Sequence, residues 1–374
     1  MIPMKKNSTP SSNKWLALLF TCLLLSCTVC NAATTETLKP DTITLSLTEA
    51  GTLHERIGNN KKLKIECLRL TGMLNIDDIQ FIREMAGCYY DTKGHKYDGH
   101  LRYLDISGAT LTNTDNKEVS IYPRDPSEYE GTPWPSAEAY INDKGTPVAI
   151  FAYLYDMEEI VLPAKLKSIG DDAFIFCRSL KSINIPESVQ EIGLRAFFGC
   201  SSLKSMKLPI GITEIKSGLL SGCTNLTSID IPYTTEEIGH NAFSKCTSLK
   251  SIELPYSLNN MGISVFWNCN SLKSIYALNP QGIGIKGKPF EEYTQSQCTL
   301  YVPEGSMYNY QCWEEWYAFN HIVEFSPTGI NGVHSAAERR EVERYDTSGR
   351  RLTSPTKGLN IVRFNDGTTR KVMK

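Results

Sequence analysis

The sequence predicts a solenoid of short strands and turns, mostly β with short helices, bounded by irregular capping coils and followed by a small C-terminal β appendage. The main observation is a repeat of 23 residues, which runs through five blocks without a gap from Met157 to Ser271. A block of this size cannot bury its own apolar face, so each coil must pack on the next. Three columns recur at this step: Pro163, Pro186, Pro209, Pro232 and Pro255; Cys177, Cys200, Cys223, Cys246 and Cys269; and Met157, Leu180, Leu203, Leu226, Leu249 and Leu272.

Within a block, the local signals predict one short and mostly extended coil. The stretch from Leu180 to Pro186 alternates as a strand does, with Ile183 and Ile185 inward and Asn184 outward, and the proline ends the ladder pairing. The pair Ile192-Gly193 then predicts a turn after a second short strand. The segments D-D-A-F and L-R-A-F predict one helical turn before each cysteine.

The repeat consensus, L-x-x-I-x-I-P-x-x-V-x-x-I-G-x-x-A-F-x-x-C-x-S, resembles the BspA-like leucine-rich repeat family of bacterial surface proteins. The fold class is then a leucine-rich repeat solenoid, predicted over 149–325 with its C-terminal cap. Ile150-Phe151 fills the A-F slot upstream, and 298–325 is similar to the family's terminal coil. The resemblance implies that the protein works by adhesion.

The flanks of the repeat predict caps and a loop. Residues 33–111 are predicted to form N-terminal capping repeats, with strands at 68–72 and 101–108 bridged by a helix over 76–85. Residues 112–148 contain Pro123, Pro126, Pro133, Pro135 and Pro147 with several aromatic residues, and predict an ordered loop over one edge.

The N-terminus predicts export. Basic residues precede an apolar run from Trp15 to Val29, which is typical of a signal peptide over 1–32 and too short for a permanent membrane helix. Two processing routes stay open, namely ordinary cleavage near Ala32 and lipid attachment at Cys27. The location expected is extracellular or at the outer-membrane surface.

Residues 331–374 carry ten Lys or Arg against five Asp or Glu, a local charge of +5 in a chain of formal net charge -2. Glycine turns predict three short strands there, over 343–351, 357–364 and 366–374. This basic tail resembles the C-terminal sorting signals of type IX secretion, which implies attachment at the outer membrane, whether or not the tail is cleaved. The alternative is a small solvated β appendage.

The sequence predicts no catalytic residue, no metal site and no cofactor. We find no nucleophile elbow, phosphate loop or zinc-protease motif, and the near-neutral charge argues against a nucleic-acid partner. The Cys column is best explained as buried thiols, because a disulfide needs Cβ vectors that face one another. Cys88, His95 and His100 are close enough in sequence for a metal site, but a polar turn explains them better.

The repeat instead offers a flat polar surface along its first strands. About five residues along the strand and six coils give roughly 500 Å² of face, against ~800 Å² per partner in a standard interface. The alternative, that these side chains only keep the face soluble, stays open. The candidate binding residues are Lys181, Ser182, Lys204, Lys207, Asp230, Lys250, Glu253, Lys273 and Tyr276 on this face, with Trp134 in the loop.

Two functions follow as hypotheses. The first is binding of an extracellular protein through the solenoid face and loops. The second is binding of a glycan, or an accessory role in polysaccharide use, through the aromatic loop 112–148. A glycan site needs stacking aromatic rings, for which Tyr122, Tyr129, Trp134 and Tyr140 are the candidates.

Overall fold

The structure is a computed structural model. It describes residues 41–87, 99–113, 118–121, 137–142, 145–325, 341–345, 351–352, 354, 359–364 and 369–373. The predicted signal peptide, with Cys27 and Ala32, lies outside the described residues. So do Cys88, His95, Tyr122, Tyr129 and Trp134.

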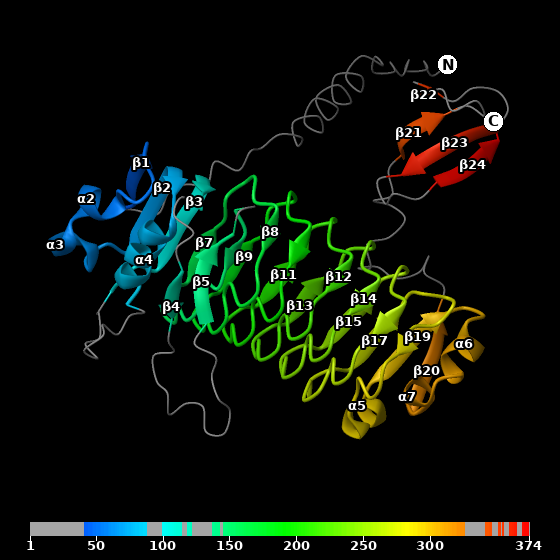
Figure 1. Ribbon diagram of the computed structural model, residues 1–374. Coiled ribbons are helices and arrows are strands. Elements are labelled where there is room, and N and C mark those ends of the chain that lie inside the picture. The colour runs from blue at the N-terminus through cyan, green and yellow to red at the C-terminus, as the bar shows by residue number, and fades with distance from the viewer. Residues whose placement is uncertain are drawn as a thin grey trace, which may run out of the picture. The chain divides into compact units, whose positions relative to one another are not determined.

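The predicted solenoid is confirmed, and its main sheet consists of parallel strands stacked coil on coil (Figure 1). In the repeat region most strands pair with the same strand of the next coil, as in Ser205 with Ser228 and Ser251 with Ser274, and the pairing is interrupted after the strands at 182–184 and 228–230. The strands are β1 (Ile43–Leu47), β2 (Cys67–Leu74), β3 (Tyr103–Leu111), β7 (Glu159–Val161), β9 (Ser182–Asn184), β11 (Ser205–Lys207), β13 (Ser228–Asp230), β15 (Ser251–Leu254), β17 (Ser274–Ala277), β19 (Thr299–Pro303) and β20 (His321–Phe325).

Each repeat also contributes a two-residue strand to a second ladder of parallel strands, which is paired throughout except between the strands at 191–192 and 214–215. From Ser168 to Met261, the first residue of each strand is partly or fully exposed and the second is buried. This is the second short strand that the Ile-Gly turn predicts. The strands are β8 (Ser168–Ile169), β10 (Glu191–Ile192), β12 (Glu214–Ile215), β14 (Glu237–Ile238), β16 (Asn260–Met261) and β18 (Gly284–Ile285).

The helical turn predicted at the Ala-Phe pair is wrong. The backbone N–H of Phe174 donates to the carbonyl of Ala196 at 2.8 Å, and that of Phe197 donates to Leu219 at 3.0 Å. These N–H groups therefore bond to the next coil, while those of Ile175 and Cys177 bond three residues back to Asp172 and Phe174, so the segment forms hydrogen-bonded turns and not a helix. The chain makes this turn with residues at positive φ, such as Asp172 at 54° and Phe176 at 55°.

Identical side chains stack on one another in the core. Phe174 and Phe197 are fully buried, with ring centroids 5.1 Å apart and planes only 1° from parallel. Leu220 interrupts this column, which resumes with Phe243 and Phe266 at 5.6 Å. The five column cysteines are buried thiols, and each donates to a carbonyl of the preceding coil at 3.1 to 3.3 Å. The structure thus agrees with the buried-thiol interpretation.

The N-terminal end is a cap of wider coils with helical returns, α2 (Leu53–Ile57), α3 (Asn59–Lys62) and α4 (Ile76–Met85). Asn75 and Asp78 form a capping box at the start of α4. The buried Arg83 donates to the carbonyl oxygens of Ile150 and Ala152, at 3.1 and 2.7 Å, which ties the cap to the repeats. The strand β1 was not predicted from the sequence.

The segment predicted as a loop, 112–148, contains three strands in its described parts. These are β4 (Val119–Ile121), β5 (Ala137–Ile141) and β6 (Pro147–Val148), joined as an antiparallel sheet. Of the four aromatic candidates for a glycan site, the structure describes the side chain of Tyr140, which is half-buried on β5.

The C-terminal cap carries the helices α5 (Glu292–Gln297), α6 (Met307–Gln311) and α7 (Glu314–Tyr317). Two buried aromatic residues fix it to the preceding coil. Tyr310 Oη donates to the carbonyl of Asn279 at 2.7 Å, and Trp316 Nε1 donates to that of Ile283 at 2.8 Å. Because both donors are satisfied, these large side chains can be buried without loss.

The basic tail forms four described strands, one more than predicted, in the antiparallel order β22-β21-β23-β24. Their bounds are β21 (Glu341–Tyr345), β22 (Arg351–Leu352), β23 (Leu359–Phe364) and β24 (Thr369–Met373). The extra strand is the two-residue β22, which begins at the last residue of the predicted segment 343–351 and ends one residue beyond it. Across the described residues, no helix has the length and apolar character needed to cross a membrane.

Candidate binding surface

The first strands of the repeats form a face with two outward rows, which we call the strand face. In β11 and β13 the outer residues are exposed and the middle one is buried, because successive side chains of a strand point to opposite sides. The first row is Ser182, Ser205, Ser228, Ser251 and Ser274. The second is Asn184, Lys207, Asp230, Glu253 and Tyr276.

The lysines that precede these strands are all exposed, but their charges are not equally available. Lys181 Nζ lies 2.5 Å from Glu158 Oε2, so this charge is paired. Lys207 lies 3.4 Å from Glu187. Lys204, Lys250 and Lys273 have no ion pair within the part of the chain that the structure describes. Lys181, the first lysine of the column, therefore adds no free positive charge to the face.

An aromatic cluster lies at the C-terminal end of the strand face. The Tyr276 and Tyr301 rings stack with centroids 4.6 Å apart and planes 11° from parallel. Phe325 packs edge-on against both, at 6.0 and 6.4 Å. All three side chains are partly exposed. Tyr276 was a predicted site residue, whereas Tyr301 and Phe325 were missed, because the constant step of the repeat is lost there.

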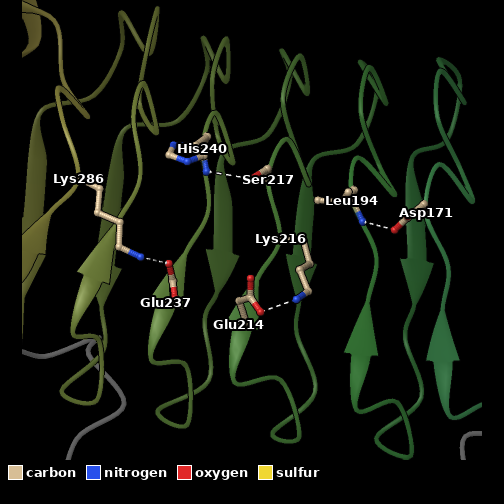
Figure 2. A network of polar contacts seen from close by, with 8 residues as sticks. All are labelled: Asp171, Leu194, Glu214, Lys216, Ser217, Glu237, His240 and Lys286. Atoms are coloured by element: carbon tan, nitrogen blue, oxygen red, sulfur yellow. Dashed lines mark hydrogen bonds and ion pairs between the residues drawn. The ribbon is translucent and has the colours of Figure 1, made fainter. Parts of the chain in front are cut away.

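The second ladder presents an acidic column made of Glu191, Glu214 and Glu237, part of which Figure 2 shows. Lys216 forms an ion pair with Glu214, and Lys286 lies 2.6 Å from Glu237. The hydrogen bond to Glu214 raises the pKa of Lys216. The column is thus partly neutralised by its own neighbours, which favours a structural role.

A further set of contacts in Figure 2 links each coil to the next along one turn. Asp171 Oδ1 accepts from the backbone N–H of Leu194 at 2.7 Å, and Ser217 Oγ accepts from that of His240 at 3.1 Å. These side chains satisfy backbone donors that the short strands leave free. They are better explained as coil caps than as ligand contacts.

The cysteines offer no nucleophile in the repeat core. Burial raises the pKa of the Cys200, Cys223 and Cys246 thiols well above its ordinary value, and that of Cys269 to about 12. Thiols held in this way are neutral and unreactive. Within the described ranges, no group of three His, Cys, Asp or Glu side chains could hold a metal ion. His100 Nδ1 lies 2.8 Å from the carbonyl of Leu63.

The parallel strands, the constant step and the stacked cores define the class of the molecule as a leucine-rich repeat solenoid. Residues 146–284 match the BspA type leucine rich repeat region in six copies. This part of the chain therefore belongs to the BspA-type leucine-rich repeats. No curated protein matches the chain.

Several solved structures are similar to parts of the chain. A leucine rich repeat protein of T. pallidum is 27% identical, over 46% of this chain and 80% of that one, with a TM-score of 0.37. One from Eubacterium ventriosum is 15% identical, over 78% and 94%, with a TM-score of 0.38. A leucine rich cell surface protein of Faecalibacterium prausnitzii is 16% identical, over 61% and 80%, with a TM-score of 0.22.

Proposed function

We propose that this chain is an exported surface protein that binds an extracellular protein through its strand face. The observation that carries the proposal is the stacked pair Tyr276 and Tyr301, which shares one rigid sheet with the unpaired Lys250 and Lys273. Tyrosine is enriched among the residues that dominate binding energies at protein interfaces. The rings are already packed against one another, so little side-chain freedom is lost on binding.

The size of the strand face together with the strands that flank it also supports a protein partner. Ladder strands stack at ~4.8 Å, so the strands from β1 to β20 extend for about 50 Å, and a width of about five residues gives roughly 800 Å². That area equals one side of a standard protein interface. The strands are held by backbone pairing and a buried core, so the surface is preorganised. Binding is favoured over catalysis because the buried thiols are unreactive and the exposed groups are spread along the sheet.

The free lysines give this surface a preference for acidic partners. Lys204, Lys250 and Lys273 project from neighbouring or nearby coils of one face, so an acidic segment can meet more than one of them at once. Such contacts chiefly raise the association rate and depend on salt. Asp230 and Glu253 lie among these lysines in the second row. Their negative charges reduce the positive potential of the face and restrict the acidic partners that can bind.

The proposal places the protein outside the cell, on the strength of the signal segment 1–32 and the basic tail 331–374. Fractionation of cells that express the full chain, and a chain ending at residue 330, tests this. We expect the full chain at the surface and the shortened chain retained in the cell envelope. Metabolic labelling with a fatty acid, with Cys27→Ala beside it, separates lipid attachment from ordinary cleavage. Full chain found in the cytoplasm would contradict the proposal.

A binding screen tests the proposed function itself. The mature chain is passed over immobilised extracellular-matrix proteins and, in parallel, over glycans. We expect binding to at least one matrix protein, and a loss of about tenfold or more with Tyr301→Ala, as is typical of an interface hot spot. Lys245→Ser, an exposed lysine on a turn away from the strand face, is the matched control. Binding to glycans alone would contradict the proposal and favour the loop 112–148.

A further inference from the structure

Both ends of the main parallel ladder are open among the described strands. β1 pairs with β2 on one side, and β20 pairs with β19 on one side. The two end strands have equal length, and both run in the common direction of the ladder. An edge strand presents unpaired N–H and C=O groups, which are a template for another strand of matching direction. The last strand of one molecule therefore has the geometry to receive the first strand of another.

The last coil also leaves aromatic side chains uncovered. Tyr308 on α6 is 76% exposed, Tyr317 on α7 is 67% exposed, and Trp313 between them is 43% exposed. The core aromatic column itself is covered at this end, because Phe290 packs on the fully buried Trp316 with ring centroids 5.1 Å apart. The three exposed rings lie outside that column, on the last return, and add apolar surface that a second molecule would bury.

The charges of the two end returns are opposite in sign. Residues 298–325 contain Glu304, Glu314, Glu315 and Glu324 and no Lys or Arg, which gives a formal charge of -4. At the other end, residues 53–64, which span α2 and α3, contain four basic residues and one acidic residue, Glu55, which gives a formal charge of +3. Lys62 is paired with Glu84, while Arg56, Lys61 and Lys64 are exposed. Opposite charges at facing surfaces favour encounter and set the register.

We propose that this solenoid associates head to tail with further copies of itself, β20 of one molecule adding the β1 of the next. The ladder then continues in parallel across the junction. The basic return α2–α3 covers the acidic, aromatic return α6–α7. A second copy is the occupant that fits, because it supplies a strand of the right length and direction followed at once by a basic helical segment. A contact between two different ends repeats without closing, so the product is an open chain of molecules.

This association goes beyond the proposed ligand binding and has a consequence for it. Each added copy extends the strand face, so the free lysines and tyrosines of several molecules would lie along one continuous sheet. Weak contacts repeated along such a surface bind far more tightly than one of them does. The end-charge substitutions that test self-association leave Tyr276, Tyr301 and the free lysines of the strand face unchanged, so the two proposals can fail independently.

Sedimentation velocity on the mature chain, over a wide range of concentration at low and high salt, tests the inference. We expect species that grow with concentration and dissociate as salt rises. Lys61→Glu with Lys64→Glu removes the net positive charge of the basic end, and Glu304→Lys with Glu314→Lys removes the net negative charge of the acidic end. Each of these double variants should be entirely monomeric. Lys165→Glu with Lys167→Glu, two exposed lysines in an interior coil, is the control of equal charge change and should associate as wild type does.

Mixing the two variants gives the decisive result. The unchanged acidic end of the first still meets the unchanged basic end of the second, so association into pairs should return in the mixture although neither protein associates alone. Far-ultraviolet circular dichroism confirms that each variant is folded. A wild-type chain that is monomeric at every concentration would overturn the inference. So would a mixture that stays monomeric, or a control pair that disrupts association as strongly as the end variants.

Discussion

His240 Nδ1 accepts a hydrogen bond at 2.8 Å from the backbone N–H of Ile263, one repeat later in the chain. The same turn position is held by Asp171 toward Leu194 and by Ser217 toward His240. Three of the four residues in this column thus supply an acceptor of different chemistry, and the fourth, Leu194, supplies none. A strand of this short length leaves backbone donors unpaired beside it, and a side chain from the neighbouring coil satisfies them.

Replacing His240 by Leu should lower the free energy of unfolding by about 0.5 to 1.5 kcal/mol, the net value of one hydrogen bond at a partly solvated site. His240→Asp should retain most of the stability, because Asp171 already performs this role in an earlier coil. Denaturant unfolding of the two variants measures the difference. Equal losses for Leu and Asp would show that the ring, and not its acceptor nitrogen, is what the turn requires.

Phe197 and Phe243 occupy equivalent buried slots, so Phe→Ala at either should cost about 3 to 5 kcal/mol of unfolding free energy. The ring at each site stacks on a neighbouring phenylalanine, and its removal leaves a cavity in a core that runs through adjacent coils. Chemical denaturation gives the loss directly. A change below ~1 kcal/mol at both sites would mean that the repeat register assigned to these residues is incorrect.

The buried thiols should resist alkylation in the folded protein while Cys312 reacts, because Cys312 is exposed. Mass spectrometry after brief treatment with iodoacetamide at mildly alkaline pH distinguishes the sites. In denatured, unreduced protein the five column cysteines should all react, since they are thiols in the fold. Column cysteines that remain unlabelled after denaturation would show that they are oxidised, contrary to the structure.

Stability should fall at alkaline pH because these thiols are neutral in the folded state. Burial raises the pKa of Cys269 from 9.0 to about 12. The unfolded chain loses its thiol protons above about pH 9, whereas the folded chain holds them, so unfolding is favoured progressively between pH 9 and 12. In denaturation measured at several pH values, Cys269→Ala should lose less unfolding free energy per pH unit than wild type does. An identical slope in the variant would assign the effect to other groups.

The free lysines of the strand face should contribute unequally to ligand binding. Lys204→Ser, Lys250→Ser and Lys273→Ser together should weaken binding and flatten its dependence on salt. Lys181→Ser should change either property little, because Glu158 already neutralises that charge. Surface plasmon resonance at several salt concentrations measures both. A Lys181 variant as damaging as the triple variant would contradict this order.

The repeat period was sufficient to predict the architecture and its core. Leucine, cysteine and phenylalanine columns at a constant interval place Phe197 and Cys200 in buried slots, because identical coils must stack in register. The turn at Phe176 could not be read in the same way. Its positive φ is rare for a bulky residue, and it is imposed by hydrogen bonds to the next coil, which no local propensity reports.

The candidate site was predictable where the period holds and not where it changes. Tyr276 falls in a recognised column, but its ladder partner Tyr301 follows it at more than one repeat interval and was overlooked. The pairing of Lys181 with Glu158 depends on side-chain geometry between coils, and a column of lysines in the sequence does not reveal it. The two-residue strand β22 is too short to give a pattern of alternation.

The most direct test compares two variants on one ligand. The matrix protein that binds most tightly in the screen is titrated against the wild-type mature chain, a Tyr276→Ala, Tyr301→Ala double variant, and Trp134→Ala. The strand-face account predicts that the tyrosine variant loses binding by tenfold or more, about 1.4 kcal/mol, while Trp134→Ala binds as wild type does. Binding that survives the tyrosine substitutions and fails with Trp134→Ala would place the site in the loop 112–148, with the solenoid serving as its scaffold.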